Sequence, residues 1–247
     1  MALTSIDINV TNNNYKGYIK VESIKKTGAS GSIMYVLIFR RRHGASEDYT
    51  KVFEKVITNL NQLTFLYMDL SVKSGTSYDY HVELTDGNSA GYTIIEYGDI
   101  NNVECWFDGL FIGNDEKQYF APLNCETTIT RNTIATYVTT LSSRTPYRVS
   151  NSAINYTTGQ SSGLFIPFDA NNQFDIQQTK EYLEEIVDFL TNGEEKILKT
   201  SDGEAWYVSI DPGVNITSDD RYQGSSRIEF NWTEIGDVPV FKKVVSA

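Results

Sequence analysis

Pairs of acidic residues are the first feature of this sequence that could do chemistry, because a glycosidase needs two carboxyl groups that face each other about 5–10 Å apart. Three pairs are close in sequence: Asp108 with Asp115, Glu194 with Glu195, and Asp219 with Asp220. Adjacent residues of a strand point to opposite faces and cannot converge on one substrate. The chain also has 32 Asp and Glu residues, so neighbouring acids arise by chance. We therefore expect no catalytic pair here, and a small hydrolase is the weakest of our hypotheses.

Metal sites depend on residue spacing, and the chain offers only two histidines, His43 and His81. Neither has a second His or Cys at the spacing of a zinc site, so we expect two solvated side chains. Acids also lie beside Gly113 and Gly203, but a calcium loop needs regularly spaced oxygen ligands, and this spacing is missing. Both stretches are typical of turns. The sequence thus predicts no catalytic residue, no cofactor site and no metal site.

Two further groups of reactive side chains have structural interpretations. Cys105 has no histidine partner, which favours a buried thiol over a nucleophile. A Cys105–Cys125 disulfide is one alternative and two free thiols the other, because two cysteines do not make a disulfide framework. Arg40, Arg41 and Arg42 could bind an anion, but successive residues of a strand lie on opposite faces. A solvated strand end is the expected arrangement.

Composition and charge restrict the partners. The net charge of −11 argues against nucleic acid as a ligand, because phosphate binding needs a basic face. No apolar run is long enough to cross a membrane, and the first residues lack the basic and apolar regions of a signal peptide. We therefore expect assembly in a cytoplasm. The 16 Tyr, 12 Phe and 3 Trp favour strands, and exposed rings could stack on sugars.

Strand-like segments fill residues 1–98. Residues 33–42 and 49–56 predict a hairpin, and 63–72 predict another strand. Residues 77–84 alternate cleanly, with the core-facing side chains Tyr78, Tyr80, Val82 and Leu84. Short strands separated by turns predict a small β-sandwich, with 92–97 as its last strand.

Residues 99–247 predict a second β-rich domain, a sandwich or barrel, with one flanking α-helix at about 176–191. The apolar stripe of this helix comprises Ile176, Leu183, Ile186, Val187 and Leu190, with Tyr182 at its edge. Asp175 and Gln178 form a capping-box pattern, and Gly193 is placed to end the helix. Four acids lie on the outer side: Glu181, Glu184, Glu185 and Asp188. Asp202-Gly203 and 211–213 predict turns, and 226–237 predict a closing strand with Ile228, Phe230 and Trp232 inward.

The N-terminal segment resembles a fibronectin type III-like module. In that family a strand is followed by an Asp, a tight Gly turn and a Tyr-x-Tyr-x-Val strand, and Asp69, Gly75, Tyr78, Tyr80 and Val82 fill these positions. The resemblance implies a tyrosine corner, in which a hydroxyl near the start of the strand bonds back to the chain. It also implies a spacer or binding unit.

Residues 174–237, with "DFLTNGEEKILKT", "SDGEAWYVSI" and "IEFNWTEIGD", resemble the C-terminal region of structural proteins from tailed-phage virions. The upstream "VECWFDGLFIGNDEKQYFAPL" is similar to tail and baseplate components. The resemblance implies a non-enzymatic virion protein of a tailed phage, or of a phage-derived injection particle, that forms a ring or bridges neighbouring tail proteins. Its expected partners are other tail or baseplate proteins and copies of itself. The alternatives are a carbohydrate-binding adhesion protein and a neck or collar protein.

Overall fold

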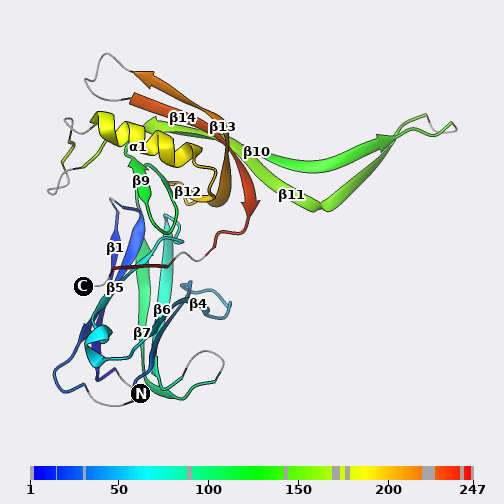
Figure 1. Cartoon of the computed structure of the whole chain (residues 1–247). Helices are drawn as coiled ribbons and strands as arrows, with labels where there is room; N and C mark the ends of the chain where they lie inside the picture. The colour runs from blue at the N-terminus through cyan, green and yellow to red at the C-terminus, as the bar shows by residue number, and fades with distance from the viewer. Residues whose placement is uncertain are drawn as a thin grey trace. The chain divides into compact units, whose positions relative to one another are not determined.

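Antiparallel strand pairing organises most of the chain. The computed structural model describes residues 3–14, 16–29, 32–87, 91–141, 144–168, 173–175, 179–218, 226–239 and 242–245. The protein is mainly β with one flanking α-helix (Figure 1), which confirms the predicted fold class. No helix within these ranges is long and apolar enough to cross a membrane.

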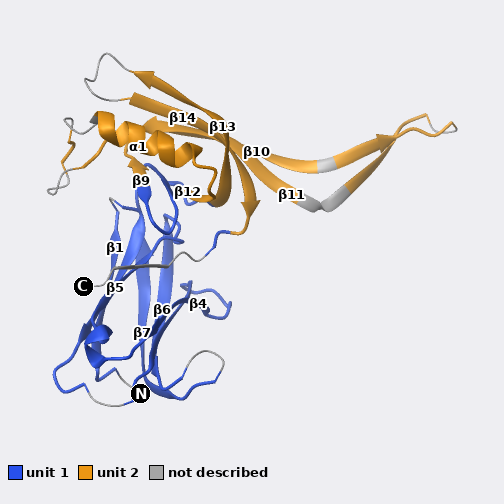
Figure 2. Ribbon diagram, in the orientation of Figure 1, with its two compact units in different colours: residues 1–118, 199–205, 238–247 blue, residues 119–198, 206–237 orange. Residues whose placement is uncertain are grey.

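The chain divides into two units (Figure 2). Unit 1 comprises residues 1–118, 199–205 and 238–247, and unit 2 comprises residues 119–198 and 206–237. The sequence suggests a boundary between two domains after residue 98. This domain boundary stays a prediction. Both units draw on segments that are far apart in the chain.

Unit 1 contains two four-stranded sheets. One has the order β1 (Ile6–Asn13), β2 (Tyr18–Lys25), β5 (Phe65–Asp69) and β15 (Lys242–Val245). The other has the order β4 (Thr50–Val56), β3 (Tyr35–Arg42), β6 (Thr76–Thr85) and β7 (Ile94–Cys105). A 3₁₀ turn, Leu60–Leu63, precedes β5, and the short β8 (Leu110–Gly113) follows β7.

The core of unit 1 lies between these sheets. Phe53 of β4 stacks on Phe65 and Tyr67 of β5, with ring centroids 5.2 and 4.7 Å apart. Tyr80 and Val82 are fully buried, so the predicted inward face of β6 is confirmed. The predicted hairpin is also confirmed, because β3 and β4 pair with Tyr35 opposite Val56.

Strand β7 is longer than the sequence predicts. Residues 98–103 contain a glycine and polar side chains, which are typical of a connection, yet they continue the strand as far as Cys105. Pairing with β6 extends to Thr76 opposite Cys105. The register between β6 and β7 shifts at a bulge between Ile100 and Val103, where Asn102 lies in the left-handed region at φ 57°. Backbone pairing with a neighbour therefore overrides the local composition.

Unit 2 is organised around one large sheet. The strands β10 (Leu123–Val138), β11 (Tyr147–Leu164), β14 (Ser226–Gly236), β13 (Ala205–Ser218) and β12 (Lys196–Thr200) are neighbours in that order, and β9 (Gln118–Ala121) precedes them in the chain. Residues 199–205, at the end of β12 and the start of β13, belong to unit 1. The predicted inward residues Ile228, Phe230 and Trp232 are buried, and the rings of Trp206 and Trp232 lie 5.0 Å apart. Residues 211–213 do not form the predicted turn, because they lie inside β13 as a bulge between Ile210 and Val214.

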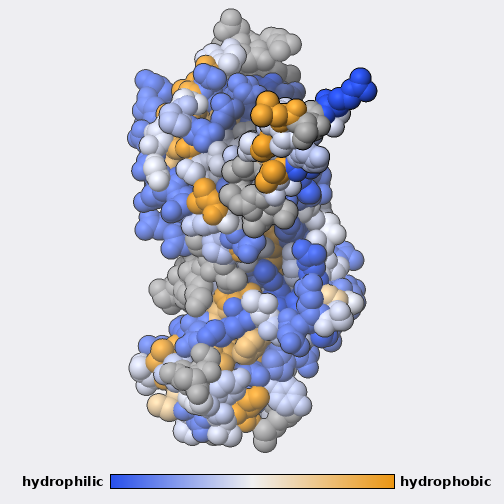
Figure 3. All heavy atoms as spheres, turned by 90° about the vertical axis from the view of Figure 1, so that its right-hand side faces the viewer, coloured by the Kyte–Doolittle hydropathy of each residue, from blue (hydrophilic) through white to orange (hydrophobic). Residues whose placement is uncertain are grey.

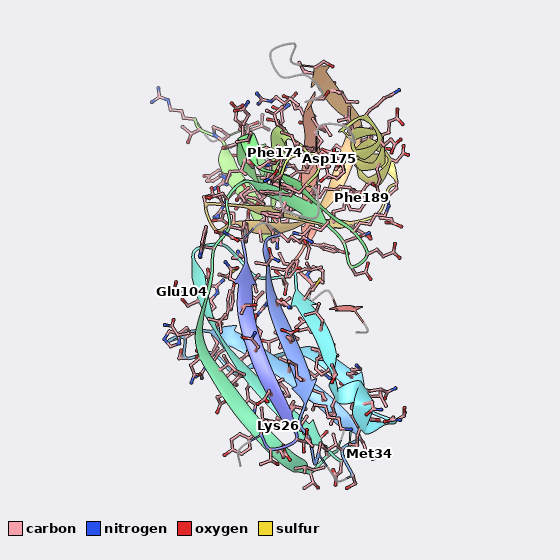
Figure 4. The ribbon with its side chains drawn as sticks, turned by 90° about the vertical axis from the view of Figure 1, so that its left-hand side faces the viewer. Lys26, Met34, Glu104, Phe174, Asp175 and Phe189 are labelled. Carbon is pink, nitrogen blue, oxygen red and sulfur yellow. The ribbon has the colours of Figure 1, made fainter. Side chains whose placement is uncertain are left out.

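The helix α1 (Thr179–Thr191) packs beside this sheet and matches the predicted helix at its C-terminal end. Ile186, Phe189 and Leu190 are buried, and Figure 4 labels Phe189 on this helix. The sequence stripe omitted Phe189, whose ring centroid lies 4.9 Å from that of Tyr119 of β9, with the two rings tilted by 54°. Gly193 follows at φ 78°, as predicted for a left-handed cap. Ile176 and Gln178, and with them the capping box, lie outside the described residues.

Candidate interaction surface

The longest strands of the protein form a two-stranded extension of unit 2. Strand β11 pairs with β14 only along residues 158–164, whereas it pairs with β10 as far as Val138 opposite Tyr147. Among the described residues, β10 and β11 thus pair only with each other over residues 131–156, which we call the arm (Figure 1). The eight residues 131–138 of β10 span about 26 Å at about 3.3 Å per residue.

One face of the arm is apolar. Val138 lies opposite Tyr147, and Thr136 lies opposite Val149, and directly opposed residues share a face of a sheet. The exposed fractions of Val138, Tyr147 and Val149 are 45%, 63% and 59%. In Figure 3, where the arm points toward the viewer, hydrophobic residues lie at the surface among hydrophilic ones. Side chains of this kind are normally covered when they gather in one place.

Arg148, on the opposite face, and Arg144, in the turn between β10 and β11, are both basic, and we call these two arginines the basic face of the arm. Arg148 lies opposite Tyr137, on the other side of the ribbon from Val138. Residues 127–168 contain three arginines, Arg131, Arg144 and Arg148, and no lysine, Asp or Glu. All three arginines are exposed. None of them forms an ion pair with any residue that the structure describes. The sequence contains this signal as an acid-free stretch in an acidic chain, but none of the motifs considered above includes it.

The base of the arm is held tightly to the sheet. A Cβ at Gly159 would lie 2.4 Å from the ring of Trp232 and 2.6 Å from the carbonyl oxygen of Thr128, so only glycine fits here. The indole Nε1–H of Trp232 donates to Ser161 Oγ at 3.0 Å. The backbone N–H of Thr157 donates to Glu234 at 2.7 Å. The arm therefore starts from a fixed point, which sets its direction.

The acidic pairs singled out in the sequence lie on the surface. Asp108, Asp115, Glu194 and Glu195 are exposed, and Asp219 and Asp220 lie outside the described residues. No three His, Cys, Asp or Glu side chains of the described part of the chain are grouped to hold a metal ion. The loop at 113–116 is held by Asn114, whose side chain accepts from the N–H groups of Glu116 and Lys117. This is the turn chemistry that the spacing indicates.

The expectation of a solvated histidine is wrong for His81. Its Nδ1 lies 2.6 Å from Asp99 and its Nε2 lies 3.1 Å from Glu83. The rings of Tyr49 and Tyr97 each lie 5.7 Å from the imidazole. Glu83 lies two residues along the same strand, so its contact follows from the alternation of β6, whereas Asp99, Tyr49 and Tyr97 come from other parts of the chain and have no local signal.

The expectation of a solvated strand end is likewise wrong for Arg40 and Arg41, whereas Arg42 is exposed. Arg40 donates through Nη1 to both carboxylate oxygens of Asp69, at 2.7 and 2.6 Å, and to Ser71. Asp69 is fully buried and also accepts from the hydroxyl of Tyr80 at 2.9 Å. Burial lowers the pKa of Arg40, but the adjacent carboxylate outweighs it and holds the pKa above its usual value. Arg41 pairs with Asp79 at 3.2 Å.

Both cysteines are free thiols. Cys105 is buried, and its burial raises the pKa of the thiol to about 12, which keeps it protonated and unreactive near neutral pH. The Sγ–H of Cys125 donates to the carbonyl oxygen of Ala121 at 3.0 Å. Neither thiol is placed for nucleophilic chemistry.

A buried lysine in unit 1 escaped the sequence analysis. Lys199 is 2% exposed, and its Nζ donates to the carbonyl oxygens of Gly17 and of Leu70, the latter at 2.9 Å. The ammonium also lies 5.2 Å from the ring centre of Phe107. Burial lowers the pKa of Lys199 to about 8. The ammonium group joins two turns, because it donates a hydrogen bond to a carbonyl oxygen in each of them and lies beside an aromatic ring.

The predicted hydroxyl contact at the start of β6 is present. Tyr78 is buried, and its hydroxyl oxygen accepts from the backbone N–H of Lys73 at 2.9 Å. Gly75, between them, has φ 68°. This bond closes the turn between β5 and β6.

No model of a known protein family matches the chain, and no curated protein matches it. A chain of a virion of a native gene transfer agent particle is 18% identical, with a TM-score of 0.32; the match covers 56% of this chain and 96% of that one. A chain from the tail of an empty gene transfer agent particle is 17% identical, with a TM-score of 0.33, and the match covers 56% and 95%. These TM-scores are too low to carry a functional conclusion.

Proposed function

We propose that this chain is a non-enzymatic structural protein of a tailed phage or of a phage-derived injection particle. It belongs to the tail or baseplate, where it forms a ring or bridges neighbouring proteins. The observation that carries the proposal is the arm of unit 2. The type of particle comes from the resemblance of residues 174–237 to virion structural proteins.

The arm supports a role in assembly because it is poorly stabilised on its own. A two-stranded ribbon is only marginally stable in water unless another element covers it. Val138, Tyr147 and Val149 together offer an apolar face that a neighbouring protein would bury, and each fully buried side chain of this size contributes about 1.5–3 kcal/mol.

Electron microscopy of purified particles tests the proposal. The chain should fit into the density of the tail, baseplate or neck, with the apolar face of the arm against another subunit. A neck position would favour the collar alternative. Absence of the chain from purified particles would refute the proposal.

A variant separates the arm from the rest of the molecule. Tyr147→Ser/Val149→Ser should keep the fold, because both side chains are exposed, yet it should reduce incorporation into particles. Ile24→Ser is a matched control, since Ile24 is 49% exposed on unit 1. Incorporation is measured by quantitative mass spectrometry of purified particles. Equal incorporation of the arm variant and the control would show that the arm is not an assembly element.

Recognition of carbohydrate is a second candidate function. Tyr97 is 40% exposed beside His81, with Tyr49 and the carboxylate of Asp99 close by. Aromatic faces beside carboxylates can stack on sugar rings and bind their hydroxyl groups. Binding to host cell wall that is lost in Tyr97→Ala would favour this function. A glycan array and wall pull-down without binding would count against it.

A further inference from the structure

The acidic residues of α1 form one exposed stripe. Glu181, Glu184 and Asp188 lie three and four positions apart, so they share a face of the helix. All three are exposed, because the opposite side of the helix is buried against the sheet. Lys180 is the one basic residue of α1 and reaches Glu184 at 3.9 Å. With four acids and one lysine, α1 carries a net charge of −3.

Apart from Lys180, no basic side chain that the structure describes forms an ion pair with this stripe. Figure 1 shows the arm leaving the sheet on the side away from α1. Figure 4, which views the molecule from the opposite end, shows α1 at the surface with its side chains projecting outward. Within one molecule the arm thus extends away from α1 (Figure 1), so we expect its tip to meet an acidic face of α1 only in a second molecule.

We infer that the acidic face of α1 is the docking surface for the basic face of the arm from a second copy of this chain. The inference rests on the proposed assembly function and names the partner of the arm. The charges match, since residues 127–168 carry +3 and α1 carries −3. The residues outside the arm together carry −14, and α1 places −3 of that charge on a single helix of 13 residues.

The spacing of the charges also matches. Glu181 and Asp188 are seven residues apart, which is about 10 Å along a helix. Arg144 and Arg148 are four residues apart near the end of the arm, which is up to about 13 Å in extended chain. Two arginines can therefore reach two carboxylates of one stripe. Arginine suits this contact because its guanidinium presents several donors to a carboxylate.

The contact would join different surfaces of the two copies. Such a head-to-tail interface generates a ring if the rotation between copies closes, and an open filament if it does not. The apolar face of the arm, with Val138, Tyr147 and Val149, stays available for a neighbouring protein. One arm would then link two partners, as a bridging component requires.

A charge exchange on the full chain tests this pairing. The arm variant is Arg144→Glu/Arg148→Glu, the helix variant is Glu184→Arg/Asp188→Arg, and the exchange variant carries all four changes. Mass photometry and sedimentation velocity measure self-association of the purified chain at low salt, and circular dichroism checks the fold. Arg42→Glu is the control, because Arg42 is exposed on unit 1.

Wild-type chain and the control should self-associate. The arm and helix variants should each raise the dissociation constant about tenfold or more, because like charges then face each other. The exchange variant, or an equimolar mixture of arm and helix variants, should restore association. A monomeric wild type, or an exchange variant and mixture that stay dissociated, would overturn the inference. The proposed function would survive either result if particles contain the chain.

Discussion

Replacing Arg40 with methionine should destabilise unit 1 strongly, because it would leave a buried carboxylate without its cation. Asp69 is fully buried, and its oxygens lie 2.6 and 2.7 Å from the guanidinium. Breaking a buried ion pair by removing one partner costs about 3–5 kcal/mol. We expect a loss near 3 kcal/mol for Arg40→Met, because Tyr80 and Ser71 still donate to the carboxylate.

Urea unfolding followed by far-UV circular dichroism, together with calorimetry, measures this loss. A chain of this size loses about 2–4 °C in Tm per kcal/mol, so the shift should be about 6–12 °C. Arg42→Met is the matched control at the exposed end of the same strand and should change stability by less than about 0.5 kcal/mol.

A second substitution distinguishes the buried charge from lost packing. Arg40→Met/Asp69→Asn removes the charge but keeps an acceptor for Tyr80, so it should be more stable than Arg40→Met alone. If the double variant is no more stable than the single one, the uncompensated charge is not the cause, and the reasoning fails.

Three further predictions concern stability. The free energy of unfolding of the wild type, minus that of Lys199→Met, should rise between pH 8 and 10.5, because in this range the unfolded lysine binds a proton that the folded lysine has released. Urea midpoints of the two proteins that stay parallel over this pH range would contradict this. Gly159→Ala should lose about 1–3 kcal/mol, measured by urea unfolding, because its Cβ overlaps Trp232, and an unchanged midpoint would show that the ring can move. Tyr78→Phe should lose about 1 kcal/mol in thermal unfolding, because the N–H of Lys73 loses its acceptor; no loss would mean that water replaces the hydroxyl.

The local features of this fold follow from short stretches of sequence. Alternation in 77–84 predicts the buried face of β6, because side chains of a strand alternate between its two faces. Gly193 ends α1 and Asp202-Gly203 turns the chain, with Gly203 at φ 89°, because few residues other than glycine adopt these conformations. Each of these features depends on neighbours within a few residues.

The features that the sequence did not predict depend on distant residues. Arg40 and Asp69 are 29 residues apart, and Lys199 and Gly17 are 182 apart. In the sequence, Arg40 belongs to a polar strand end and Lys199 to a run of charged residues. Only the fold brings their partners within reach, and burial then changes the energetic consequence of each charge. The arm is similar, because its length depends on where β14 stops pairing with β11.

The distribution of charge suggests how copies of the chain would meet. The acid-free arm carries +3 in a molecule whose other residues carry −14, so two molecules that approach body to body repel each other. The arm extends about 26 Å beyond its last pairing with the sheet, which is about three Debye lengths at physiological salt. Its arginines therefore meet an approaching acidic surface before the bodies do. A first contact of this kind selects the orientation of the partner, since only the arm attracts it. Assembly would then begin at the arm, and burial of its apolar face would follow as the step that fixes the contact.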